Sequence, residues 1–190
     1  MGLFVYKMFD KGLKCRGYQF KVDLNVCEHA TCVKEGFHAA ENPLDCLSYY
    51  SNFDDSECWL CYADGEVHEN GSDSKISCTR LEILRRLSKP EFVHEAVRYI
   101  LSHPKRPVSS RVQLLDGKKK IGTVNSNNFA IVIGEEPKAR ATDDGDVIAL
   151  LVTARRGEGY EKLVFLYGDE VKRNTVYRAW RDPDECEQME

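Results

Sequence analysis

Two short segments hold the residues best suited to bind a metal ion. Cys27, His29 and Cys32 lie close together, and Cys58 and Cys61 form a C-x-x-C pair further along the chain. Thiolates and imidazoles at such spacings are the ligands of structural zinc sites. However, Cys58 and Cys61 stand in an apolar run without a glycine turn, so in a strand their side chains would point to opposite faces. We therefore expect buried, reduced thiols and no metal, with zinc at these five residues as the alternative.

A second group of residues could contact an anionic ligand. His38 follows Gly36 and precedes a predicted helix start, where free backbone N–H groups can hold an anion. Lys7 and Arg16 stand beside apolar strand residues, where a cation is usually paired and sometimes contacts a ligand. A packed imidazole is the favoured interpretation of His38, and an anion contact is the alternative.

The common catalytic motifs are absent from the sequence. It contains no GxxxxGK[ST] loop, GxSxG elbow, HExxH pair or GxGxxG turn. These absences remove the commonest hydrolase, zinc protease and dinucleotide-binding interpretations. The segment 116–120 contains a glycine followed by lysines, but it does not match the nucleotide-binding loop, so we interpret it as a turn with a basic edge. We therefore assign no catalytic residues and no cofactor, and the sequence favours a protein that is not an enzyme.

Charge and cysteine content limit the possible partners and the compartment. The chain has 27 Lys and Arg against 31 Asp and Glu, a formal net charge of −4, so nothing attracts it generally to nucleic acid or an anionic membrane. Its start lacks the basic and apolar regions of a signal peptide, and no apolar run is long enough to span a membrane. We expect a cytoplasmic protein whose eight cysteines are reduced.

The first half of the chain is typical of a mixed sheet with two helices. Apolar or alternating runs predict strands over 3–9, 17–23, 57–68 and 76–84. Asn42 followed by Pro43 predicts a short helix from about 43 to 50, because Asn caps helices and Pro fits the first helical position.

The clearest helical signal lies between Ser88 and Leu101. Ser88 and Glu91 form a capping box around Pro90, and apolar residues then recur at helical spacing. This pattern predicts a helix over 89–102, which Pro104 and Pro107 end.

The second half is typical of short strands separated by turns. Two columns of small and apolar residues recur at nine-residue steps, and this register suits either a meander or a short β-solenoid-like stack; we expect the meander. The columns are Val112, Ile121, Ala130, Ala139, Ile148, and Leu114, Thr123, Val132, Ala141, Leu150. Three longer strands are predicted over 147–152, 163–167 and 175–180.

The expected fold class is therefore α+β. Residues 1–104 form an α+β domain with two helices on a sheet, residues 108–182 form an all-β subdomain, and residues 183–190 form an acidic tail.

Three blocks of the first half resemble the N-terminal domain of an uncharacterised family of phage and prophage proteins. They are Val5-Tyr6-Lys7-Met8-Phe9-Asp10, Leu13-Lys14-Cys15-Arg16-Gly17-Tyr18-Gln19-Phe20, and the block from Gly36 to Asp45 with Tyr49-Tyr50. The resemblance covers residues 3–102 and implies a mobile-element setting without an established activity. Family members often have Cys where Ala40 stands here.

The block from Gly36 to Tyr50 is also similar to a segment of ADP-ribosyltransferases that lines an NAD pocket. The matching positions would be Tyr6, Gly36, His38 and Tyr49, and no glutamate matches the catalytic position. Together with the residue-based analysis, this similarity defines a candidate ligand-binding set. Its members are Tyr6, Lys7, Arg16, Gly36, His38, Asn42 and Tyr49.

These observations predict a phage-type accessory protein that binds a host or viral macromolecule and inhibits a host defence system, in the manner of anti-CRISPR proteins. The expected partner is a host or phage protein, such as a nucleic-acid-binding defence complex, with no membrane contact and no direct nucleic-acid binding. The alternatives are an ADP-ribosyltransferase-like NAD- or nucleotide-binding domain and a structural virion or assembly component.

Overall fold

The computed structural model describes residues 2–32, 34–69, 71, 73–115, 120–154 and 159–180. Residues 116–119 of the predicted turn, the acidic tail and Cys186 therefore lie outside the described residues. The chain divides into two compact units, Met1–Tyr99 and Ile100–Glu190, and this division falls inside a helix, a few residues before the boundary expected after 104. In the described part, no helix combines the length and apolarity needed to span a bilayer.

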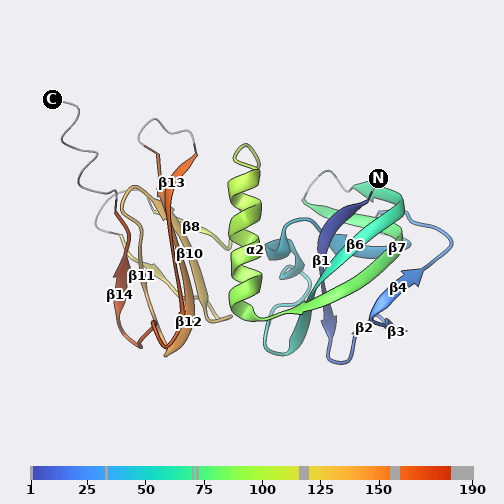
Figure 1. Ribbon diagram of the computed structural model, residues 1–190, viewed down its shortest axis with the longest axis horizontal. Helices are drawn as coiled ribbons and strands as arrows, with labels where there is room; N and C mark the ends of the chain where they lie inside the picture. Colours follow the sequence, from blue (N-terminus) through green and yellow to red (C-terminus); the bar gives the residue numbers. More distant parts are fainter. Residues whose placement is uncertain are drawn as a thin grey trace. The chain divides into compact units, whose positions relative to one another are not determined.

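The N-terminal unit is a curved sheet with two helices (Figure 1). Its strands are β1 (Leu3–Asp10), β2 (Lys14–Cys15), β3 (Tyr18–Gln19), β4 (Asp23–Val26), β5 (Phe37–Ala40), β6 (Ser56–Glu69) and β7 (Lys75–Leu87), and its helices are α1 (Pro43–Cys46) and α2 (Lys89–Ser102). The hydrogen-bonded order is β3-β2-β1-β5-β7-β4, and β6 pairs with both β1 and β7. Because β6 joins these two strands, β1, β5, β7 and β6 close into a ring.

The interior of this ring is the core of the unit. It holds Val5 and Phe9 from β1, Phe37 from β5, Cys61 from β6 and Ile76 from β7, all buried in one cluster. The two long strands β6 and β7 form the curved hairpin that dominates the unit in Figure 1. Gly65, at φ +77°, lies where their register shifts, so a bulge interrupts the pairing there without ending β6.

The two predicted helices differ in how closely they match the expectation. The helix over 89–102 is confirmed, and Ser88 and Glu91 make the reciprocal bonds of a capping box. Asn42 caps Leu44 as expected, but α1 ends at Cys46 rather than near 50, and turns follow it. The stretch expected as one strand over 17–23 is also shorter, because β3 ends at Gln19.

The C-terminal unit is built from two sheets. Its strands are β8 (Gln113–Leu114), β9 (Gly122–Thr123), β10 (Phe129–Gly134), β11 (Lys138–Arg140), β12 (Gly145–Thr153), β13 (Tyr160–Gly168) and β14 (Val176–Arg178). One sheet has the order β13-β12-β10-β8 and the other β14-β11-β9. Successive strands from β8 to β12 alternate between the two sheets.

The parallel pairing of β8 to β12 overturns the expected meander. Ala130 pairs with Ile148, two nine-residue steps further along, and β9 pairs with β11 in the same parallel sense. A meander requires antiparallel neighbours, whereas this arrangement is that of the solenoid-like stack. From Ala130 onwards the repeated columns fill its interior, with Ala130, Ala139 and Ile148 fully buried, whereas Leu114 and Ile121 at its start are exposed. Antiparallel pairing appears only where β13 and β14 join β12 and β11.

Candidate functional site

The N-terminal unit has a polar gap between β1 and β5. These strands share a single residue pair, Tyr6 with Ala40, and do not continue their ladder towards His38. The Lys7 Nζ occupies this position instead and donates a hydrogen bond to the His38 carbonyl oxygen at 2.7 Å. We call this region the β1–β5 gap and define it by Lys7, Cys15, His38 and Tyr50.

Lys7 is a buried cation on the interior side of β1. Its exposed fraction is 6%, and its Nζ lies 5.3 Å and 5.2 Å from the ring centroids of Phe9 and Phe20. Nζ also approaches the Cys15 Sγ at 3.9 Å, and the Tyr50 hydroxyl donates to the same sulfur at 3.4 Å. Burial is the main reason that the pKa of Tyr50 lies above its usual value, with the bond to Cys15 as the next cause.

Several cations surround the His38 imidazole. Burial lowers the pKa of His38, and the charges of Lys7, Lys75 and Arg16 lower it further. Lys75 pairs with Ala40 across β5 and β7, so it is a diagonal neighbour of His38 on the same face. The Lys75 Nζ also lies 4.3 Å from the ring centroid of Tyr49, whose exposed fraction is 54%. Of the candidate ligand-binding set, the structure thus brings Lys7, Arg16, His38 and Tyr49 to one region.

The other three members of the set have local structural partners. The Tyr6 hydroxyl points away from the interior and donates to the Glu95 carboxylate at 2.8 Å, and Tyr6 is buried. Gly36 has φ +88° and packs closely on Ala30. A Cβ added to Gly36 would lie 2.9 Å from the Cα of Ala30. Asn42 caps α1. These local partners account for Tyr6, Gly36 and Asn42 without a ligand.

The five potential zinc ligands are not gathered into one site. Cys61 lies in the interior cluster, whereas Cys58 occupies the opposite face of β6, as its strand position predicts. The Cys27 thiol contacts backbone oxygens of Cys78 and Thr79 instead. Throughout the described part of the chain, no three His, Cys, Asp or Glu residues are grouped closely enough to hold a metal ion.

Most of the described cysteines behave as core residues. All seven are free thiols, and burial raises the pKa of Cys46 and of Cys78 to about 12 and that of Cys58 well above its usual value. Thiols in this state are poor nucleophiles at neutral pH, because the thiolate is the reactive form. Cys15 differs because it is only half-buried and lies beside Lys7.

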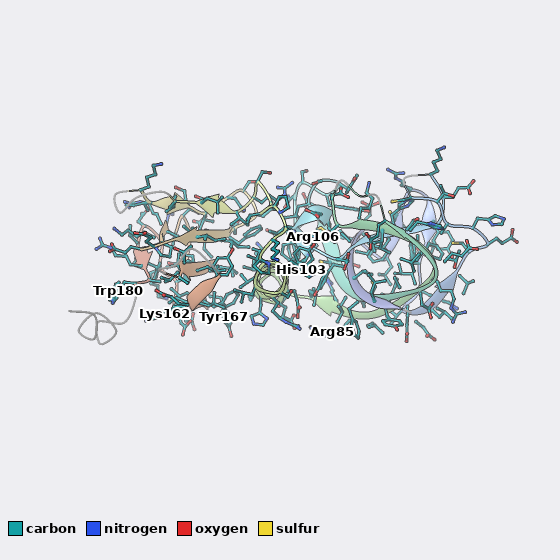
Figure 2. All side chains as sticks on the ribbon, turned by 90° about the horizontal axis from the view of Figure 1, so that it is seen from above. Arg85, His103, Arg106, Lys162, Tyr167 and Trp180 are labelled. Atoms are coloured by element: carbon teal, nitrogen blue, oxygen red, sulfur yellow. The ribbon has the colours of Figure 1, made fainter. Side chains whose placement is uncertain are left out.

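The C-terminal unit carries a second candidate, which the sequence did not indicate. Strand β13 is the end of its sheet and pairs with β12 alone among the described strands. Figure 2 labels Lys162 and Tyr167 on this end strand. Val164 and Leu166 pack against the core of the unit, whereas Leu163 and Tyr167, on the other face, are 38% and 49% exposed.

The other strands at sheet ends are much shorter. Strand β13 has nine residues, whereas β3, β8 and β9 have two each, β14 has three and β4 has four. Natural sheets commonly protect their edges with short strands and charged side chains, and a long apolar edge strand favours pairing with another chain. The charges of β13, Glu161 and Lys162, lie at its start, so residues 163–167 form an apolar edge.

Comparison with known proteins gives one family model that matches part of the chain. Residues 3–95 match the family model described as "Domain of unknown function (DUF7666)". This match runs from β1 into the first half of α2 and includes the β1–β5 gap. No curated protein and no solved structure matches the chain.

Proposed function

We propose that this protein is a phage-type accessory protein that binds a macromolecular partner through the apolar edge of β13. The length and apolar character of this edge strand are the observation that carries the proposal. The resemblance of the first half to phage and prophage proteins supplies the biological setting.

Strand addition explains how such an edge would recognise a partner. An extended segment of another protein that pairs with β13 satisfies the backbone N–H and C=O groups of the edge, and this pairing provides affinity without requiring a particular sequence. Specificity then comes from alternate side chains, because Leu163, Phe165 and Tyr167 share one face of the strand. A partner segment with apolar residues at every second position would fit this face.

The charge of the chain suits a basic partner. Its formal net charge is −4, and complementary charge increases the rate at which two proteins associate. A nucleic-acid-binding protein of a host defence system has such a basic surface, and occupying it would inhibit the system. The partner is therefore a host or phage protein, and the protein acts as a stoichiometric inhibitor.

Affinity purification from a bacterial host tests this proposal. The tagged full chain is compared with the Leu163→Lys/Tyr167→Lys double variant, in which two exposed apolar side chains of β13 become charged. We expect the captured partner to be lost from the double variant, since edge lysines oppose strand pairing.

The matched control carries the same charge change at the opposite end of the stack. Leu114 and Ile121 are also exposed, and Leu114→Lys/Ile121→Lys should retain the partner. Equal capture by the β13 variant and the wild-type chain would contradict the proposal, as would the absence of any specific partner.

A further inference from the structure

The cations around His38 lack carboxylate partners. Lys7, Arg16 and Lys75 form no ion pair with any carboxylate among the described residues, although acidic residues outnumber basic ones in the chain. Charges in or near a protein interior are normally paired, because an isolated charge is costly to remove from water. Three cations that converge on one imidazole therefore leave a local excess of positive charge.

A buried hydroxyl lies beside this excess of charge. Ser77 is fully buried, and its Oγ has no hydrogen-bond partner. In the sheet, Ser77 stands directly between His38 on β5 and His68 on β6, and Lys75 precedes it on the same face of β7. A buried hydroxyl without a partner is uncommon, because losing its hydrogen bonds to water is unfavourable.

Lys7 adds positive charge from within the sheet. Its Nζ reaches the gap where β1 and β5 separate and binds the backbone oxygen of His38 itself. The imidazole, the ammonium groups and the hydroxyl thus come from three neighbouring strands, with His38, Lys75 and Ser77 on one face of the sheet and Lys7 on its interior side. Fixed donors of this kind are typical of sites that bind phosphate.

We propose that the rim of the β1–β5 gap, formed by His38, Lys75, Arg16 and Ser77, binds the phosphate group of a small molecule. Phosphate fits better than a carboxylate because it carries up to two negative charges and accepts several hydrogen bonds at once. Lys7 stabilises the bound anion from beneath the rim. This site lies in the N-terminal unit and does not depend on strand β13.

Calorimetry on the full chain with three probes tests the proposal. Inorganic phosphate and ADP should bind, and adenosine, which has no phosphate, should not. Equal affinity for the two phosphate compounds would identify a free-phosphate site, and tighter binding of ADP would identify an organic phosphate. The proposal is wrong if adenosine binds as tightly as ADP or if neither phosphate compound binds at millimolar concentration.

Variants at one exposed and one half-buried position, both outside the core cluster, locate the site. Arg16→Gln and Lys75→Gln should each weaken phosphate binding about tenfold, since a charge-assisted hydrogen bond contributes about this factor. Arg80→Gln is the matched control, because Arg80 lies on the same strand as Lys75 but has its own partner, Asp64, at 2.8 Å. Unchanged affinity in both test variants would place the anion elsewhere.

The His38 imidazole gives an independent measurement. A bound phosphate supplies the missing negative charge, so it should raise the pKa of His38 towards or above the usual value, followed by NMR of the imidazole protons. Binding that leaves the His38 titration unchanged would overturn the assignment of the site to the rim of the gap.

Discussion

Lys7 shows how a single side chain can replace part of a β-ladder. Where β1 and β5 separate, the His38 carbonyl oxygen would lack a strand partner, and the Lys7 Nζ supplies the donor instead. The cost of burying the ammonium is offset by this bond and by the faces of Phe9 and Phe20. The same arrangement leaves a positive charge beneath His38.

The pKa of His38 predicts a pH dependence of stability. In the folded chain this pKa is below the usual 6.5, because burial and then the nearby cations disfavour the charged imidazole. Between the folded and unfolded pKa values the unfolded chain binds more protons, so the free energy of unfolding should decrease as the pH falls below about 6.5. Urea unfolding measured between about pH 5 and 7.5 should show this decrease.

Removing the His38 imidazole shows how much it contributes to the pH dependence of stability. His38→Gln should flatten the pH profile in this window. His68→Gln, which makes the same substitution at an exposed histidine of β6, is the matched control. If His38→Gln and the wild-type chain have the same slope, the decrease comes from other groups.

Asp146 is the residue whose loss should most disturb the C-terminal unit. It is fully buried, and its Oδ2 accepts bonds from the backbone N–H groups of Thr142 and Asp143 and from the Thr142 hydroxyl. Asp146→Ala should lower the free energy of unfolding by about 2–4 kcal/mol, because buried donors lose a charged acceptor.

Asp143→Ala is the matched control in the same turn. The Asp143 carboxylate is exposed and lies 3.7 Å from the Arg173 guanidinium, so removing it should cost less than about 0.5 kcal/mol. Chemical denaturation measures both changes, and equal losses in the two variants would show that Asp146 does not hold the turn.

At the scale of an element, β5 depends on the glycine that precedes it. Gly36 has φ +88°, and an added Cβ would lie 2.9 Å from the Cα and Cβ of Ala30. Gly36→Ala should therefore lower the free energy of unfolding by more than Gly12→Ala, which has a similar φ of +79° but open space around it. Backbone strain alone costs about 1 kcal/mol, and the clash adds to it. Similar losses in both variants would contradict this explanation.

Local signals in the sequence predicted several elements well. The bounds of α2 follow from its capping box and from the prolines beyond it, and from Ala130 onwards the nine-residue columns mark residues that fill the stack. The direction of strand pairing could not be predicted, because the same spacing fits parallel and antiparallel neighbours. The structure resolves this choice for β8 to β12.

The candidate sites depend on contacts between residues far apart in the sequence. An anion contact by Lys7, Arg16 and His38 was only the alternative interpretation of the sequence, and Lys75 and Ser77 join them only because β7 pairs with β5. The apolar edge of β13 depends in the same way on which strand ends the sheet. Both facts follow from long-range pairing, which local patterns do not encode.

At the scale of the molecule, the chain consists of two compact units, and the boundary between them along the sequence falls within α2. The first turns of this helix belong to the N-terminal unit, since Phe92 packs on Phe53 and Glu95 accepts a bond from Tyr6. We expect residues 1–104 to fold alone, with a cooperative unfolding transition by circular dichroism and the phosphate affinity of the full chain. A fragment without cooperative unfolding would show that the two units depend on each other.

Hydrogen exchange on the complex with the captured partner tests the central claim most directly. Backbone amides at the free edge of a strand exchange readily, and pairing with a partner strand protects them. We predict that the partner slows exchange within residues 160–168 and has a smaller effect at β4, another strand that ends its sheet. Protection that appears elsewhere while residues 160–168 exchange as in the free protein would contradict binding through the edge of β13.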